Sequence, residues 1–261
     1  MTDINIASLL DTARAAALEA GKAIMEVYRT KDFEVDYKAD DSPLTKADQA
    51  AHTIIEKHLS ATGIPVLSEE GAHTAYQERK KWPLYWLIDP LDGTKEFVKK
   101  NGEFTVNIAF MQQSAPVAGV IYAPDLDALY YGSEDTGVLK VEKEQEQQLM
   151  PLQASTSLEE LLQKPQVRII SSRSHRSAET EKFISQFKNT EIISMGSSLK
   201  FMLLAENKAE IYPRFSPCME WDTAAAHAIL KALNRTIYQT DLQSELVYNK
   251  EDLLNPSFIA F

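Results

Sequence analysis

The strongest constraint on the fold of this 261-residue chain is the stretch "WLIDPLDGT", in which an apolar run ends in two aspartates. The apolar residues 84–88 predict a buried strand, and Pro90 is expected to end it because proline lacks the backbone N–H that a sheet needs. Asp89 and Asp92 then emerge at a strand end, where clefts form in α/β proteins. The following "DGTKEF" predicts a helix start, with Gly93 letting backbone amides approach a ligand.

Two carboxylates three residues apart at a strand end repel each other unless a cation lies between them. A magnesium site is the simplest compensation for Asp89 and Asp92. Taken singly, each residue also has a plain structural explanation, because aspartate often caps a helix or ends a strand.

Three further acidic elements allow the same two interpretations. Glu69 and Glu70 follow the predicted strand "IPVL". They could be metal ligands, or they could form a solvated turn. Asp222 precedes a predicted helix and could simply cap it. Asp48 lies three residues after Thr45, the likely cap of a helix, which is the spacing of a capping box.

The rest of the chain predicts a mixed fold in two closely packed halves. Apolar periodicity predicts an opening helix over 4–28, and "FTVNIAFM", "PVAGVIYAP" and "ALYYGS" predict antiparallel strands. The polar run 140–166 is predicted to be an irregular domain junction. Beyond it, "VRIISSRSH", "EIISMGS" and "AEIYPRF" predict strands that alternate with helices near 177–188, 197–207 and 222–233. The boundary is therefore expected near residue 150.

Composition narrows the function. A formal net charge of -11 argues against nonspecific nucleic-acid binding, and no apolar run is long enough to span a bilayer. The N-terminal "MTDINIASLL" has no basic region of the kind a signal peptide needs, and the single Cys218 cannot form an internal disulfide. We expect a cytoplasmic protein.

In type, spacing and order, the Glu-Glu pair, "WLIDPLDGT" and "WDTAAAHAI" together resemble the motifs of the magnesium-dependent, lithium-sensitive phosphatase superfamily that includes inositol monophosphatases and fructose bisphosphatases. Within it, the chain is similar to bacterial 3'(2'),5'-bisphosphate nucleotidases of the CysQ type, almost end to end. The similarity continues through "ADDSPLTKADQAAH", "PVLSEE", "GVIYAP", "SRSH", "GSSLKF" and "YPRF".

The resemblance implies a layered αβαβα sandwich of the inositol monophosphatase type. Residues 1–150 would form an α+β half with most metal ligands. Residues 151–261 would form an α/β half that supplies Asp222 and the nucleotide contacts. Attachment to the inner face of a membrane is suggested for some relatives, but this chain has no lipidation motif or strongly basic amphipathic helix to support it.

The resemblance also implies removal of the 3'-phosphate of adenosine 3',5'-bisphosphate (PAP) to leave AMP, by direct attack of water, with the 5'-phosphosulfate analogue PAPS as a further substrate. Two or three Mg²⁺ ions would be bound by Glu69, Asp89, Asp92, Asp222 and the carbonyl of Leu91. Thr94 and Asp48 would orient and deprotonate the attacking water, supported by Glu70.

The implied substrate contacts lie mainly in the second half, and each also has a structural explanation. The resemblance implies Lys200 and Arg214 as partners of the 5'-phosphate. As structural alternatives, His175 could cap a helix, Lys200 could be solvated, and Arg214 could pair with local acids. The residues implied to contact substrate are Glu69, Leu91, Asp92, Gly93, Thr94, His175, Ser197, Lys200, Arg214 and Asp222.

The effect of Glu220 and the oligomeric state are not set by the sequence. Glu220 adds a carboxylate next to Asp222 where related enzymes often carry an uncharged residue, which bears on metal affinity and pH dependence.

Three alternatives remain. A haloacid dehalogenase-type phosphatase is disfavoured because its two aspartates are separated by one residue, whereas here two intervene. An inositol or sugar phosphatase of the same superfamily keeps the mechanism and changes the substrate. A catalytically idle magnesium-binding module is disfavoured by the intact Asp48 and Thr94, since binding alone needs neither.

Overall fold

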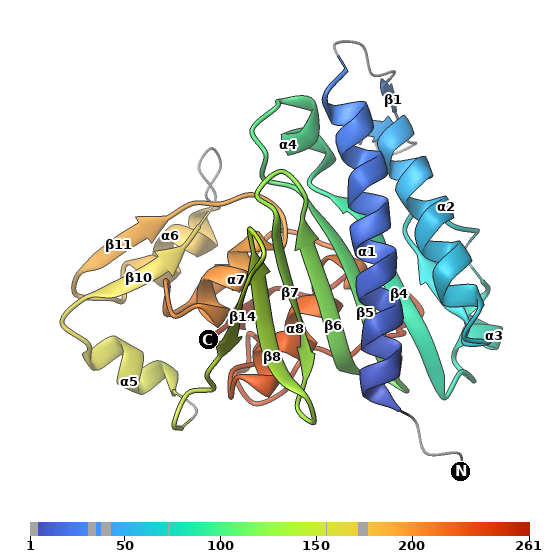
Figure 1. Ribbon diagram of the computed structural model, residues 1–261. Helices are drawn as coiled ribbons and strands as arrows, with labels where there is room; N and C mark the ends of the chain where they lie inside the picture. Colours follow the sequence, from blue (N-terminus) through green and yellow to red (C-terminus); the bar gives the residue numbers. More distant parts are fainter. Residues whose placement is uncertain (1–4, 31–34, 38–42, 73, 155, 172–176) are drawn as a thin grey trace.

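A seven-stranded sheet runs through the middle of the protein in this computed structural model, which describes residues 5–30, 35–37, 43–72, 74–154, 156–171 and 177–261 (Figure 1). Its strand order is β3-β4-β5-β6-β7-β8-β9. The β3–β4 pair is parallel and every other neighbouring pair is antiparallel, which confirms the expected antiparallel strands. The strands are β3 (Val66–Ser68), β4 (Leu84–Asp92), β5 (Thr105–Gln112), β6 (Ala115–Ala123), β7 (Ala128–Ser133), β8 (Gly137–Glu142) and β9 (Gln145–Leu149).

Two long helices cover one face of this sheet. They are α1 (Ile6–Tyr28) and α2 (Lys46–Ser60), whose apolar stripes are buried against β4, β5 and β6 (Figure 1). The shorter elements of this half are β1 (Val35–Tyr37), β2 (Pro43–Thr45), α3 (Tyr76–Arg79) and α4 (Thr94–Val98). The expected opening helix is thus confirmed.

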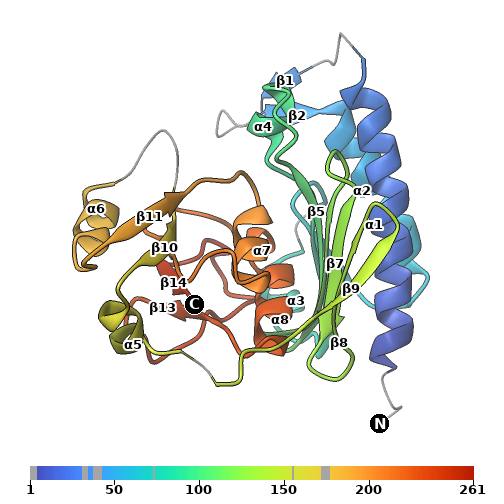
Figure 2. The ribbon, with the colours of Figure 1, turned by 60° about the vertical axis from the view of Figure 1, so that its left-hand side comes forward.

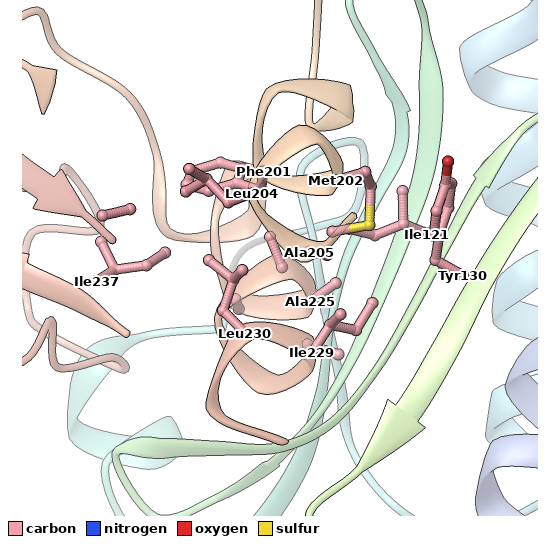
Figure 3. Close-up of a cluster of buried hydrophobic side chains, with 14 of the residues drawn as sticks. Ile121, Tyr130, Phe201, Met202, Leu204, Ala205, Ala225, Ile229, Leu230 and Ile237 are labelled. Carbon is pink, nitrogen blue, oxygen red and sulfur yellow. The ribbon is translucent and has the colours of Figure 1, made fainter. Parts of the chain in front are cut away.

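The other face packs against α7 (Leu199–Ala205) and α8 (Ala224–Ala232). Figure 3 shows these two helices between the sheet, represented by Ile121 and Tyr130, and Ile237 beyond them. The approach of α8 to β6 is close: a Cβ at Gly119 would lie 2.1 Å from the carbonyl oxygen of Ala225. A glycine is therefore required there, and it fixes the depth at which α8 sits.

Two small sheets form a further layer beyond α7 and α8 (Figure 2). One pairs β10 (Val167–Ile170) with β11 (Thr190–Ile193) in parallel, and the other has the order β12-β14-β13. Helices α5 (Leu158–Gln163) and α6 (Ala178–Ile184) pack against this layer. The remaining elements are β12 (Tyr212–Arg214), the 3-10 helix η1 (Glu220–Asp222), β13 (Ile237–Gln239) and β14 (Phe258–Ala260). The result is the expected αβαβα sandwich.

The polar run 140–166 differs from its prediction as an irregular junction. It contains the end of β8, the whole of β9 and α5. Most of β9 is exposed, and it is an edge strand paired on one side with β8. Polar residues suit such an edge, so the apolar pattern that reveals a buried strand is missing.

No helix within the described ranges combines the length and apolar character needed to cross a bilayer.

Helix α8 carries a completely buried histidine whose ring is held at both nitrogens. His227 Nδ1 lies 2.9 Å from the Tyr248 hydroxyl, and Nε2 lies 2.8 Å from Thr236 Oγ1. Burial lowers the pKa of His227 from 6.5 to about 3; nearby Glu245 opposes this shift and Lys231 adds to it. The folded protein therefore keeps this ring neutral.

We expect this histidine to make the protein acid-sensitive. The unfolded chain takes up a proton near pH 6.5 that the folded chain takes up only near pH 3, so stability falls as the pH drops through that window. When the pH is lowered from 7.5 to 5, the free energy of unfolding of the wild type should fall by about 2 kcal/mol more than that of His227→Gln. Urea unfolding at a fixed Mg²⁺ concentration measures both values.

The matched control is His58→Gln, which removes a partly exposed histidine paired with Glu19. Its free energy of unfolding should fall between pH 7.5 and pH 5 by as much as that of the wild type. Equal losses for wild type and His227→Gln would contradict the prediction.

Candidate active site

Three carboxylates from separate parts of the chain converge at one point. Glu69 follows β3, Asp89 lies in β4 and Asp222 ends η1, and each offers an oxygen within 4.8 Å of the others. The parallel pairing of β3 with β4 places Glu69 beside Asp89, and Glu69 N donates to Ile88 O at 3.2 Å. The fold of η1 then brings in Asp222 from the second half.

Strand β4 does not end at Pro90, contrary to the prediction from sequence. It continues to Asp92 with a shift of register: Asp89 pairs with Asn107 and Asp92 with Thr105, so β4 carries one extra residue. A bulge tolerates a residue without an N–H. The Leu91 N–H, which follows the proline, donates to Asp89 Oδ1 at 3.0 Å. The bulge thus holds one oxygen of Asp89 in place.

Asp92 lies next to this cluster but outside the three that gather within 4.8 Å. Its Oδ2 accepts from Ser198 Oγ at 2.8 Å and from Asn107 Nδ2 at 3.4 Å. Asn107 also donates to Ser198 Oγ, and Ser198 lies 3.0 Å from the carbonyl oxygen of Asp222. Sequence reasoning missed both partners, although Asn107 is a polar residue inside the apolar run "TVNIAF" and Ser198 belongs to "GSSLKF".

The electrostatics of the cluster favour a cation. Burial raises the pKa of Asp89 well above its usual value, and Glu69, Asp92, Asp222 and Asp48 raise it further. Burial and Asp92 raise the pKa of Asp222 to about 7, against the lowering effect of Arg214. A divalent ion with hard oxygen ligands relieves this repulsion, so the donor set fits magnesium.

Each oxygen of the Asp48 carboxylate makes a different contact. Its Oδ2 accepts from the backbone N–H of Thr45 at 2.8 Å and completes a capping box at the start of α2. Its Oδ1 accepts from Thr94 Oγ1 at 3.3 Å. The cap therefore orients the carboxylate whose other oxygen reaches Thr94, and Thr94 Oγ1 lies 3.3 Å from the carbonyl of Leu91.

A cavity of about 390 Å³ opens beside the cluster, between the region of α4 and the start of α7. Its polar wall contains Ser197 Oγ, which is buried and has no hydrogen-bond partner within the described ranges. Ser197 also has a left-handed φ of 44°, which is unusual for a residue other than glycine. The cavity is lined by Asp92, Gly93, Glu96, Lys99, Asn101, Glu103, Met195, Gly196, Ser197, Ser198, Lys200, Phe201, Arg214 and Asp222.

The predicted residues fall into several groups. Asp92, Gly93, Ser197, Lys200, Arg214 and Asp222 line the cavity, whereas Asp89 is almost fully buried. Glu70 follows Glu69 and its backbone N–H donates to Ser68 Oγ at 3.3 Å. His175 lies outside the described residues.

Glu220, the unexpected carboxylate beside Asp222, is turned into the loop that contains residues 249 and 250. It is fully buried and accepts from Asn249 N at 2.6 Å, Lys250 N at 3.1 Å and Lys250 Nζ at 2.5 Å. Burial raises its pKa, while Lys250 lowers it. Glu220 therefore anchors η1, the element that carries Asp222, to this loop.

Comparisons with known proteins agree with this arrangement. The model of the inositol monophosphatase family matches residues 5–260. A protein named 3'(2'),5'-bisphosphate nucleotidase CysQ from Salmonella typhimurium is 44% identical over 96% of this chain and 98% of its own length. The Escherichia coli K12 protein of the same name is 42% identical over the same shares.

Among solved structures, CysQ from Bacteroides thetaiotaomicron, described as a bacterial member of the inositol monophosphatase family, is 45% identical. It matches with a TM-score of 0.84 over 97% of this chain and 96% of its own. The carboxylate cluster, the layered fold and these full-length similarities lead to one conclusion: the chain belongs to the inositol monophosphatase family.

Proposed function

We propose that this protein is a magnesium-dependent 3'(2'),5'-bisphosphate nucleotidase that removes the 3'-phosphate of PAP and leaves AMP. The convergence of Glu69, Asp89 and Asp222 beside the cavity is the observation that carries the proposal. The names of the full-length relatives support the substrate class. We place the activity in the cytoplasm, which suits a chain whose single cysteine, Cys218, is buried and free.

The inositol monophosphatase family is metal-dependent, and the acidic residues here fit such a metal. We propose that Glu69, Asp89, Asp92, Asp222 and the Leu91 carbonyl hold two or three Mg²⁺ ions. When bound, these ions would hold phosphate oxygens and lower the pKa of a water molecule. Glu70 is proposed to support this set from the turn after β3.

The proton of the attacking water is assigned to the Thr94–Asp48 pair. Thr94 Oγ1 contacts both Asp48 Oδ1 and the Leu91 carbonyl, so its hydroxyl can orient a water and pass a proton to Asp48. The capping box fixes the other oxygen of Asp48 and so orients Oδ1 toward Thr94, where it would accept the proton.

The substrate is proposed to contact the wall formed by Gly93, Ser197, Lys200 and Arg214, with His175 as a further contact. The unpartnered Ser197 hydroxyl supports this placement, because a buried polar atom without a partner costs free energy unless a ligand or water satisfies it. PAPS, which also carries a 3'-phosphate, is a second substrate under this proposal.

Phosphate release from four compounds tests the proposed function directly. We expect rapid release from PAP with Mg²⁺, and much slower release from AMP, inositol 1-phosphate and fructose 1,6-bisphosphate. Chelation of Mg²⁺ should stop all release. Faster release from inositol 1-phosphate than from PAP would show that the protein is an inositol phosphatase instead. No release from any of the four compounds would favour a catalytically idle magnesium-binding module.

Asp92→Asn should lower kcat for PAP by at least about 100-fold, because the amide removes a negative charge from the proposed metal site. The fold should persist, since the asparagine Oδ1 can still accept from Ser198. Circular dichroism and the urea midpoint check the fold. Asp135→Asn, an exposed change in the turn after β7, is the matched control. Near-normal kcat in Asp92→Asn would contradict its role.

Thr94→Val removes the hydroxyl and keeps the shape of the side chain. We expect kcat to fall by about 100-fold or more, with KM and the Mg²⁺ concentration for half-activity little changed, because proton transfer is lost but binding is kept. Thr94→Ser restores the hydroxyl and should recover most of the rate. If Thr94→Val kept a kcat close to those of Thr94→Ser and the wild type, the Thr94 hydroxyl would have no part in the mechanism.

A further inference from the structure

Three positively charged side chains line the cavity of a protein whose formal net charge is -11. They are Lys99, Lys200 and Arg214, and they share the cavity with the carboxylates of Asp92, Glu96, Glu103 and Asp222. A substrate with two phosphate groups needs positive charge at a second point, away from the proposed magnesium site. The three side chains differ in how many hydrogen bonds their charged groups already make within the protein.

The guanidinium of Arg214 is largely committed to its own loop. It donates to the Tyr212 hydroxyl at 3.2 Å, to the Pro217 carbonyl at 3.0 Å and to the Ser216 carbonyl at 3.4 Å. Arg214 also lowers the pKa of Asp222, so part of its charge acts on the carboxylate cluster. It shapes the cavity more than it offers a free charge.

Lys200 is also engaged locally. Its Nζ donates to the Ser197 carbonyl at 3.0 Å, across the first turn of α7. This contact draws the ammonium group toward the backbone of the same segment and leaves less of its hydrogen-bonding capacity for a ligand.

Lys99 is different. It follows α4 directly, is exposed, and its backbone N–H bonds to the Lys95 carbonyl at 3.1 Å. Over the part of the chain that the structure describes, its ammonium group makes no hydrogen bond, ion pair or ring contact. Lys99 is therefore the lining cation whose charge is most available.

The position of Lys99 is set by a well-anchored helix. Phe97 of α4 is fully buried and packs against the rings of Tyr28 and Phe104, with ring centres 5.1 and 5.2 Å away. Lys100 packs its ammonium group over the Tyr28 ring and donates to the Tyr28 carbonyl. The base of the Lys99 side chain is thus held in place at the rim of the cavity.

The spacing along α4 suits a ligand with two anionic groups. Thr94 begins the helix beside the proposed reaction centre, and Lys99 follows five residues later, which corresponds to roughly 7.5 Å of helix. A phosphate held by Lys99 is therefore separate from a phosphate held at the carboxylate cluster. The ammonium group binds it as a flexible point charge.

We propose that Lys99 binds the phosphate of the substrate that is not hydrolysed, and so determines the preference for nucleoside bisphosphates over monophosphates. This inference rests on the proposed function, because it assumes a substrate with a phosphate at each end of the ribose.

The test compares PAP with 3'-AMP, which has the same scissile phosphate but lacks the 5'-phosphate. We expect Lys99→Met to reduce the ratio of kcat/KM for PAP to that for 3'-AMP by about tenfold, mainly through a higher KM for PAP. The salt dependence of KM for PAP should also weaken. Lys99→Arg keeps the charge and should recover most of the ratio.

The matched control is Lys95→Met, an exposed lysine on the same helix that does not line the cavity. It should keep the wild-type ratio. An unchanged ratio in Lys99→Met, or an equal change in Lys95→Met, would overturn the role of Lys99. Absence of PAP hydrolysis by the wild type would instead contradict the proposed function, so the two failures are distinguishable.

Discussion

The repulsion among three clustered carboxylates, one buried and two partly buried, is the constraint on which the rest of this structure depends. Glu69, Asp89 and Asp222 place oxygens within 4.8 Å of one another, and burial raises the pKa of Asp89 and Asp222. Carboxylates at this distance stay together only if the backbone holds them in place and a cation or a proton neutralises part of their charge. The fold supplies the first condition, and the chemistry of the donor set indicates the second.

The backbone holds the carboxylates through features on both sides of the molecule. The β4 bulge directs the Leu91 N–H onto Asp89, and the Met219 N–H donates to Asp222 Oδ2 at 3.1 Å. Gly119 lets α8 pack directly on β6, and Glu220 ties η1 to the loop that contains residues 249 and 250. The position of η1, and hence that of Asp222, follows from these contacts between the two halves and within the second half.

Local structural explanations and functional ones are compatible at several positions. Asp48 completes the capping box of α2 with one oxygen and meets Thr94 with the other. Asp89 accepts from the bulge while it contributes to the cluster. A capping interaction fixes the orientation of a carboxylate, and a fixed orientation is what a metal or a proton acceptor requires. The sequence therefore could not separate the two explanations, because the contacts of one side chain are compatible with both.

Helical periodicity predicted α1 and α2, because each has one apolar face. Short apolar runs between turn residues predicted the antiparallel strands β5 to β7, which are buried along nearly their whole length. The motifs around Asp89, Asp92 and Asp222 determined the family and the acidic residues to expect. Tertiary structure alone decided that β4 continues past Pro90, because the bulge depends on its pairing with Asn107 and Thr105 in β5. It also decided that Ser198 and Asn107 meet Asp92, and that Lys99 is the most available cation of the cavity. The physical reason is that hydrogen bonds and charge pairing join residues far apart in the chain, whereas local patterns record only which face of each element is buried.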